Sequence, residues 1–374
     1  MREPSIAYVT LYDASDVDNW SGSGFYIGRM LQKHVGTVTY VGSLESKSFF
    51  RHRAHRLFHR YSDHKVYLPE RSPEVGLFFA KQVLRKLCNA SYDLIFAAGT
   101  IPVAYLETEI PVVVYADATF SSMVGYYIKN VCGKSIAEGN AMEALALRKA
   151  SKILYASEWA ACSAMQDYGI DPRKIAVVPF GANIEKSPPR RRMRDSSHRP
   201  LNLLFVGKDW ERKGGSIAYQ VVKMLQSRGD EAILHIVGCK PEDLEKDPSV
   251  RIHGFYDKRD RLQSRRLADL YSKADFLILP SREECYGVVI CEAFAHSLPV
   301  LAHETGGIPT IVKDGTNGFL SATNDPKDFV EFITKHSGNR RYHRLQQAAR
   351  SAYEERFNWD AAGRRIRDII ESLQ

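Results

Sequence analysis

The stretch Pro280–Leu320, PSREECYGVVICEAFAHSLPVLAHETGGIPTIVKDGTNGFL, carries the most structural information in this chain. It begins at the end of the apolar run DFLILPS and contains a second apolar run, LPVLAH. Short continuous apolar runs separated by helical patterns are typical of a parallel sheet covered on both faces. The segment YGVVICEAF would open a helix directly after a strand, so its first amides, at Gly287 to Val289, could face an anionic group.

The same alternation extends to both sides of this stretch. LNLLFVG, AILHIVG and RIHGF precede it, and IAYVTLY, DLIFAAG and PVVVYAD form an earlier series. The segment between the two series, EKSPPRRRMRDSSHRP, has the composition of a linker. The sequence therefore predicts an α/β protein with two doubly wound, Rossmann-like domains: residues 1–182, a basic linker at 183–200, and residues 201–355. In such sheets ligands bind at the carboxyl ends of the strands.

Composition narrows the protein class. The 374 residues are 44% hydrophobic and 26% charged, and the six cysteines form no CxxC pair. Met1–Pro4 leads directly into a strand-like run, which does not resemble a signal peptide, and no apolar run approaches the ~20 residues needed to span a bilayer. We expect a cytoplasmic protein whose membrane contact, if it has one, is peripheral.

The formal charge of +8 is concentrated in two segments. Residues 51–65 carry a net +4 and residues 186–199 a net +5, which leaves −1 for the remainder. This distribution argues against a nucleic-acid-binding surface. In the first segment, apolar residues recur at the spacing of a helix, so the segment either packs on its domain or lies on an anionic membrane. These apolar residues are Ala54, Leu57, Phe58 and Tyr61. The histidines of the segment lack a nearby carboxylate or cysteine in the sequence, so we do not expect a metal site there.

The two glutamates of the opening stretch, Glu284 and Glu292, are separated by seven residues. With the prolines and glycines around it, this E-x7-E pattern resembles the nucleotide-sugar signature of family 4 (group 1) glycosyltransferases, which have the GT-B fold. The resemblance implies that Glu284 holds hydroxyls of the sugar and Glu292 the ribose of a nucleotide-sugar donor. It also implies that the donor binds along Tyr286, Gly287, Val288 and Val289.

Other segments carry the same resemblance. In LLFVGKDWERKGGS, Lys208 and Lys213 stand where family members commonly place an arginine and a lysine that reach the leaving diphosphate. Lys208 keeps the charge but lacks the bidentate fork of arginine. Another stretch resembles the family's segment of helix, strand, second helix and inter-domain strand: RKASKILYASEWAACSAMQDYGIDPRKIAVVPFGAN. RFNWDAAGRRI resembles its terminal helix, which implies that residues 356–374 return to the first domain.

Asp117, in YADATF, stands where many family members have a histidine near the reacting sugar. A carboxylate there could accept a hydrogen bond from the donor sugar or the acceptor and stabilise an oxocarbenium-like centre. The alternative is an aspartate that caps the following helix. Ser297, where the family often has glycine, and Thr310, where it often has glutamate, are further departures.

The N-terminal stretch Asp16–Leu31, DVDNWSGSGFYIGRML, holds a glycine turn before a helix. With the donor site in the second domain, the resemblance places the amides of Gly22 and Gly24 near the donor phosphates. The spacing GxGxxxG weakly imitates a dinucleotide-binding turn. Asp16 and Asp18 are a candidate metal pair, but two carboxylates alone do not make a metal site. The resemblance implies that no metal and no other cofactor is needed, because helix amides and lysines stabilise the leaving diphosphate.

The resemblance thus predicts a glycosyltransferase that moves a hexose-type sugar from a UDP- or GDP-linked donor to an acceptor hydroxyl. It implies retention of the anomeric configuration and a glycan or lipid-linked glycan as acceptor. Two alternatives stay open: a nucleotide-sugar-binding protein without transfer activity, and a dinucleotide-dependent oxidoreductase, which leaves Pro280–Leu320 unexplained.

Overall fold

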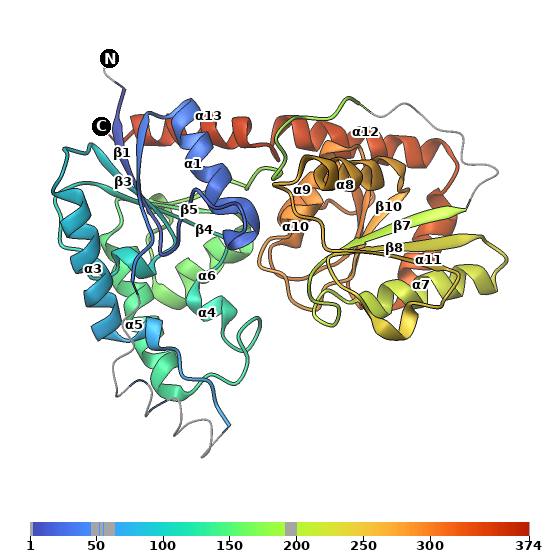
Figure 1. The fold of residues 1–374 in the computed structure, drawn as a ribbon, viewed down its shortest axis with the longest axis horizontal. Coiled ribbons are helices and arrows are strands. Elements are labelled where there is room, and N and C mark those ends of the chain that lie inside the picture. The colour runs from blue at the N-terminus through green and yellow to red at the C-terminus, as the bar shows by residue number, and fades with distance from the viewer. Residues whose placement is uncertain (1–2, 46–51, 53–54, 56–63, 191–199, 374) are drawn as a thin grey trace. The chain divides into compact units, whose positions relative to one another are not determined.

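The computed structural model describes residues 3–45, 52, 55, 64–190 and 200–373. The contacts between residues divide the chain into two units (Figure 1). Unit 1 contains Met1–Pro179 and Ala362–Gln374, and unit 2 contains Phe180–Ala361. Residues 180–190, which the sequence assigns in part to a linker, therefore belong to unit 2 by their contacts.

Unit 1 is built on a six-stranded parallel sheet with the strand order β2-β1-β3-β4-β5-β6. The strands β3 and β4 are continuous apolar runs that are almost wholly buried, as expected for the centre of a parallel sheet covered on both faces. The strands are β1 Ser5–Val9, β2 Thr37–Val41, β3 Leu94–Ala98, β4 Val112–Ala116, β5 Lys152–Tyr155 and β6 Ile175–Val177. The helices are α1 Ser23–His34, α3 Pro73–Leu87, α4 Phe120–Met123, α5 Gly133–Lys149 and α6 Glu158–Tyr168.

Unit 2 repeats this architecture with the strand order β12-β11-β10-β7-β8-β9, again parallel throughout. Its core joins strand residues such as Leu203 and Ile278 to the apolar faces of α7 and α11. The strands are β7 Leu201–Val206, β8 Ala232–Val237, β9 Val250–Gly254, β10 Phe276–Leu279, β11 Val300–His303 and β12 Gly318–Ser321. The helices are α7 Gly215–Ser227, α8 Arg261–Lys273, α9 Val288–Ala295, α10 Ile308–Ile311, α11 Pro326–His336 and α12 Arg340–Glu355.

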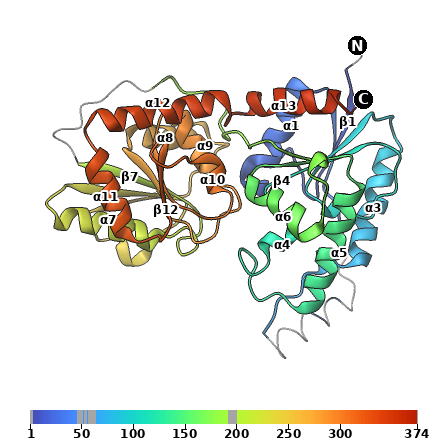
Figure 2. The same ribbon diagram turned by 180° about the vertical axis from the view of Figure 1, so that it is seen from behind.

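The last helix, α13 Trp359–Glu371, leaves unit 2 after Ala361, and its remaining residues belong to unit 1. Figure 2 shows it beside α1. A Cβ atom on Gly363 would lie 2.5 Å from the Cδ2 atom of His34, so glycine allows the two helices to pack closely. The predicted fold class, two Rossmann-like domains with a C-terminal helix that returns to the first, is confirmed.

The basic segment at residues 51–65 is described only at His52, His55, His64 and Lys65. The predicted apolar stripe at Ala54, Leu57, Phe58 and Tyr61 lies outside the described residues. The Nδ1 atom of buried His52 lies 3.0 Å from the hydroxyl of Tyr67. Within the described chain, no helix has both the length and the hydropathy to cross a membrane.

Candidate functional site

Glu284 and Glu292 lie at the carboxyl end of β10, one in the loop after the strand and the other on α9. Both are buried, with 7% and 1% of their surfaces exposed. Burial of a carboxylate is costly unless cations or hydrogen-bond donors surround it. The partners of these two side chains therefore define the candidate site.

Glu284 forms an ion pair with Lys213, and both side chains are largely buried. The Oγ atom of Ser281 lies 3.5 Å from the same carboxylate oxygen. Lys213 comes from the loop after β7, so the structure brings together two of the predicted site residues. Two further hydrogen bonds join these loops: Arg212 donates to the carbonyl of Glu283 at 2.9 Å and accepts from the amide of Arg282 at 2.8 Å.

The two glycines after Lys213 explain how this loop fits. Gly214 has a φ of 73°, and a Cβ atom on it would lie 2.0 Å from the carbonyl oxygen of Pro280. The loop after β7 can thus approach the loop after β10 only because residue 214 has no side chain. This is the physical reason for the KGG sequence beside the glutamate.

Glu292 accepts from two residues that the sequence analysis missed. The ammonium of Lys258, from the loop after β9, pairs with its Oε1 atom, and the hydroxyl of Tyr271, on α8, donates to its Oε2 atom at 3.1 Å. Complete burial raises the pKa of Tyr271 well above its ordinary value, so this hydroxyl keeps its proton. A basic residue in a loop at a strand's carboxyl end was the only sequence signal for Lys258, and Tyr271 had none.

Helix α9 begins at Val288, directly after Gly287, whose φ of 93° is in the left-handed region, and no side chain caps the helix. The first amides of a helix have no partner within it, so Val288 and Val289 present donors at the positive end of the helix dipole. Tyr286 is buried, and its hydroxyl donates to the carbonyl of Phe180 at 2.8 Å. Because this side chain is buried and holds the turn in place, the groups of this segment that can bind an anion are backbone amides.

Lys208 follows β7 and contacts an aromatic ring. Its ammonium sits 4.8 Å from the ring centroid of Phe255, a cation–π contact. Phe255 directly follows β9 and is 54% exposed, although it is a large aromatic residue. The carboxyl ends of β7 and β9 thus present an accessible cation on an accessible ring. The sequence analysis did not single out Phe255.

In unit 1, Asp117 follows β4 and Tyr12 follows β1. Burial, followed by the nearby Asp117 carboxylate, raises the pKa of Tyr12. The Tyr12 hydroxyl is buried and has no hydrogen-bond partner among the described residues. The same hydroxyl explains why residue 24 is a glycine, because a Cβ atom on Gly24 would lie 2.5 Å from it. Gly22, with a φ of 88°, opens helix α1.

Two alternatives from the sequence are corrected or narrowed here. The residue that caps α4 is Thr119, which forms a capping box with Ser122, so the capping role considered for Asp117 is wrong. Asp16 accepts the amide of Asp18 at 3.0 Å, which makes the DVD sequence part of a turn. Within the described residues, no group of three or more His, Cys, Asp or Glu side chains could hold a metal ion.

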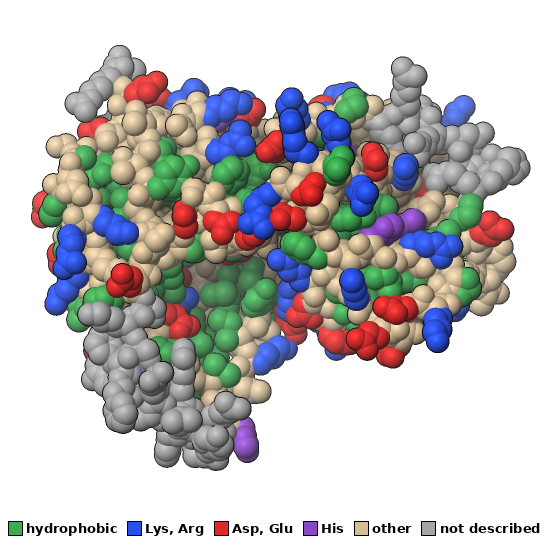
Figure 3. Space-filling model, viewed as in Figure 1, with side chains coloured by type: hydrophobic (Ala, Val, Ile, Leu, Met, Phe, Trp, Pro, Cys, Tyr) green, Lys and Arg blue, Asp and Glu red, His purple; other side chains and the backbone are tan. Residues whose placement is uncertain are grey.

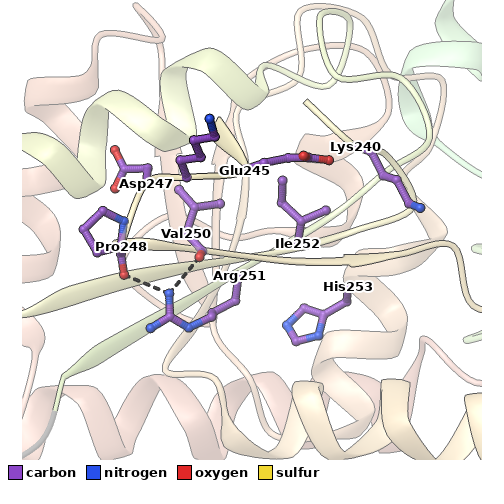
Figure 4. Close-up of a pocket in the computed structure, with 9 residues that line it drawn as sticks. Lys240, Glu245, Asp247, Pro248, Val250, Arg251, Ile252 and His253 are labelled. Carbon is purple, nitrogen blue, oxygen red and sulfur yellow. Dashed lines mark hydrogen bonds between the residues drawn. The ribbon is translucent and has the colours of Figure 1, made fainter. Parts of the chain in front are cut away.

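A cavity of about 630 Å³ lies along the edge strand β9, and none of the predicted site residues line it (Figure 4). Arg251 reaches along this edge and donates from one guanidinium nitrogen to the carbonyls of Pro248, at 2.8 Å, and Val250, at 2.9 Å. The other lining residues are Lys240, Glu245, Lys246, Asp247, Ile252 and His253. This cavity is therefore distinct from the glutamate site.

Comparison with protein families gives two matches. The model described as "Glycosyl transferases group 1" matches residues 200–339, and the model described as "Glycosyltransferase Family 4" matches residues 25–186. A D-inositol 3-phosphate glycosyltransferase of Streptomyces bingchenggensis is 28% identical over 239 residues, which cover 59% of this chain and 52% of that protein. The chain spans about half the length of the curated relatives it matches.

Solved structures share the fold over nearly the whole chain. Sucrose-phosphate synthase from Thermosynechococcus elongatus has a TM-score of 0.69 at 17% identity, with 99% of each chain covered. Anabaena Alr3699/HepE, solved with UDP and glucose, has a TM-score of 0.65 at 17% identity and covers 99% of this chain and 100% of its own. Because the two family models together match most of the residues and the folds agree from end to end, the chain belongs to the family 4, group 1 glycosyltransferases and has the GT-B fold.

Proposed function

We propose that the chain is a glycosyltransferase that moves a hexose-type sugar from a UDP- or GDP-linked donor to an acceptor hydroxyl, with retention at the anomeric carbon. The observation that carries this proposal is the arrangement of the two signature glutamates. Each is buried and paired with a lysine, and an uncapped helix opened by glycine begins between them. Glu284 then holds sugar hydroxyls, Glu292 holds the ribose, and the amides of Val288 and Val289 hold the diphosphate.

The chemistry of this reaction is mainly electrostatic. Negative charge grows on the leaving diphosphate as the bond to the sugar breaks, and the ammonium groups of Lys208 and Lys213 offset it. By analogy with a lost oxyanion donor, removal of one of these cations raises the barrier by ~2–4 kcal/mol. The family resemblance assigns the Asp117 carboxylate to the positive charge that develops on the sugar, and the amides of Gly22 and Gly24 to the donor phosphates.

The relatives suggest which ligands to test first. HepE was solved with UDP and glucose, which supports UDP and UDP-glucose as first donors. Several curated relatives act on D-inositol 3-phosphate by name, so this compound joins glycans and lipid-linked glycans as a candidate acceptor. Thr310 and Ser297 differ from the residues that are common in the family. These differences bear on the geometry of the donor pocket and not on the type of reaction.

The proposed mechanism uses no metal and no other cofactor, because lysines and helix amides supply the positive charge. Transfer measured with and without a strong chelator tests this point. Equal rates are expected, whereas loss of activity that Mg²⁺ or Mn²⁺ restores would refute metal independence.

We further propose a cytoplasmic protein that does not bind nucleic acid. Figure 3 shows acidic and basic side chains interspersed over the described surface on that side, which is unlike a nucleic-acid-binding face. For residues 51–65 the sequence leaves two alternatives, packing on the domain or contact with an anionic membrane. Flotation with anionic vesicles tests this contact, and a protein that stays at the bottom of the gradient would rule it out.

The decisive experiment measures binding of UDP, GDP and ADP, followed by release of nucleotide from the matching sugar donors. Saturable stabilisation of the wild-type protein by UDP or GDP is expected. Glu292→Ala should abolish it, because the ribose loses its acceptor, while Glu331→Ala, which changes an exposed glutamate on α11, should not. Binding without any release or transfer would favour a nucleotide-sugar-binding protein. Binding of a nicotinamide dinucleotide alone would favour the oxidoreductase.

A further inference from the structure

The carboxylate of Glu292 is held from two sides in the ligand-free chain. Lys258 occupies Oε1 and Tyr271 occupies Oε2, while only 1% of the Glu292 surface is exposed. A carboxylate has about four acceptor positions, so about two remain for a ligand. Two positions match the two hydroxyls of a vicinal diol. The protein groups therefore leave this carboxylate able to accept a ribose, while they limit how it can turn.

Lys258 is partly exposed to solvent, whereas Tyr271 is buried. The side chain of Lys258 is 31% exposed, so the ammonium lies between the buried carboxylate and solvent. The same ammonium lies 3.4 Å from the carbonyl of Asn183, whose side chain accepts from Trp359 at 3.0 Å. These contacts join the loop after β9 to the first residues of unit 2, and they hold the ammonium at one place.

The loop that carries Lys258 is itself well ordered by hydrogen bonds. The amide of Asp257 donates to Gln263 at 2.9 Å, and Asp260 caps helix α8 through the amides of Leu262 and Gln263. Asp257 also pairs with Arg259. A cation fixed by this loop meets the carboxylate with little loss of side-chain freedom, which is the condition under which a buried ion pair is favourable.

We propose that Lys258 is a positioning residue of the donor site, which together with Tyr271 holds the Glu292 carboxylate oriented for the vicinal hydroxyls of the donor ribose. The inference rests on the proposed function, and it assigns a role to a residue that does not itself contact the ribose. Without the ammonium, a buried carboxylate has no cation beside it and favours its protonated form. A protonated carboxyl has less acceptor capacity and no charge, so it binds a diol less well.

The surroundings of Glu292 allow this role to be measured as a pH effect. Three titratable groups interact with Glu292 in the described part of the chain: Lys258, Tyr271, and Cys291 of its own helix. Burial raises the pKa of the Cys291 thiol to about 12, and it raises the pKa of the Tyr271 hydroxyl well above its ordinary value. His296 stacks on Tyr271 with the ring centroids 5.3 Å apart. Because His296 is present in every variant, its effect cancels when each variant is compared with the wild type.

The test measures binding of UDP and GDP by calorimetry, each beside its 2′-deoxy analogue, from about pH 5.5 to about pH 8.5. For Lys258→Met we expect roughly 10-fold weaker binding at neutral pH, with a ratio to wild type that grows as the pH falls. We also expect the discrimination against the 2′-deoxy analogue to shrink in this variant. A lysine that merely contacted phosphate would weaken both nucleotides equally and leave the discrimination unchanged.

Control variants separate positioning from folding. Lys258→Arg should behave as the wild type, and Glu292→Gln should bind weakly with no added pH dependence. Lys223→Met removes a lysine that pairs with Asp247 elsewhere in unit 2 and should change nothing. If Lys258→Met unfolds, the double variant Lys258→Met/Glu292→Gln should fold, because it removes both charges of the pair. The pH profile is then measured on Lys258→Gln.

The outcomes are distinct. Wild-type protein that binds neither UDP nor GDP overturns the proposed function and this inference with it. Wild-type binding with a Lys258→Met profile parallel to that of the wild type, and with the full discrimination against the 2′-deoxy analogue, overturns the inference alone.

Discussion

Ser297 occupies a backbone position that usually belongs to glycine. Its φ is 55°, and it follows the end of α9. The amide of Ser297 donates to Phe294 at 2.9 Å, and that of Leu298 donates to Ala293 at 3.0 Å. This pair of bonds is a Schellman motif, in which the left-handed residue is most often glycine. The family departure noted in the sequence therefore falls on a strained residue at the end of the donor-site helix.

We expect Ser297→Gly to stabilise the protein slightly. A non-glycine residue in the left-handed region costs ~1–2 kcal/mol of stability, which glycine avoids. Glycine also loses more chain entropy on folding, which costs ~0.5–1 kcal/mol, so the net stabilisation is about 0.5 kcal/mol. Ser297→Val should lose more than ~1 kcal/mol, because a β-branched residue tolerates this conformation poorly. Urea unfolding of the three proteins measures both effects. A glycine variant clearly less stable than the wild type would show that the serine side chain contributes more than its strain costs.

The residues of the candidate site were predictable only in part. Glu284, Glu292 and Lys213 stand in local patterns, and the structure places Glu284 and Lys213 in contact. Lys258 and Tyr271 come from a loop and a helix with no motif, and only the folded sheet brings them to Glu292. The capping role considered as the alternative for Asp117 belongs to Thr119, because the residue that caps α4 is set by backbone angles that composition does not reveal.

At the scale of elements, β9 is an edge strand, and such strands offer unpaired backbone groups to other chains. Arg251 covers part of this edge through its bonds to the carbonyls of Pro248 and Val250 (Figure 4). We expect Arg251→Ala to form larger species than the wild type as concentration rises, because it frees both carbonyls and removes a charge from the edge. Sedimentation velocity measures this, with Arg228→Ala as a control that removes an exposed arginine of the same unit. Identical behaviour of the two variants would mean that Arg251 does not protect the edge.

Three side chains on neighbouring strands form a second element-scale feature. His235 on β8 lies 3.0 Å from His253 on β9 and 3.0 Å from Asn202 on β7, through opposite ring nitrogens. The carbonyl oxygen of Asn202 can only accept, so His235 donates to it and accepts from His253. Burial, followed by the charges of His253 and Arg251, lowers the pKa of His235 to about 4. The His235 ring is therefore neutral at neutral pH in the folded protein.

This histidine pair predicts acid sensitivity. Because the folded pKa of His235 lies below the unfolded value, the unfolded chain binds more protons, and the contribution to stability is complete above about pH 6.5 and disappears as the pH falls toward 4. The shift corresponds to roughly 2–3 kcal/mol, allowing for partial exposure. Urea unfolding of the wild type and His235→Gln between these pH values tests it. The wild type should lose more stability than the variant, and parallel curves would contradict the prediction.

Helices and strands were well predicted where a local sequence pattern determines them. Continuous apolar runs such as LIFAA and FLIL became buried parallel strands, because both faces of each sheet are covered. The helix that begins at Trp359 was recognised only through its family pattern. Its periodicity shows an apolar face, but which unit that face packs against is a long-range property that sequence spacing does not contain.

At the scale of the whole molecule, each of the two units has a main hydrophobic core of its own. Residues such as Ile95 and Val114 belong to the core of unit 1, and residues such as Leu203 and Ile278 belong to that of unit 2. The predicted donor-binding glutamates and lysines all lie in unit 2. A ligand that binds only the folded form of one unit stabilises that unit by mass action, by ~2.7 kcal/mol at 100 times its dissociation constant.

We therefore expect a nucleotide to stabilise the two units unequally. In hydrogen exchange measured by mass spectrometry, saturating UDP or GDP should slow exchange strongly in peptides from β7 to β12. Peptides that cover β3, β4 and β5 should change little, because their opening exposes a different core. Glu292→Ala should remove the difference. Equal protection of both sets would contradict the expectation, since it would mean that the units unfold as one cooperative body and that binding in unit 2 is felt throughout the chain.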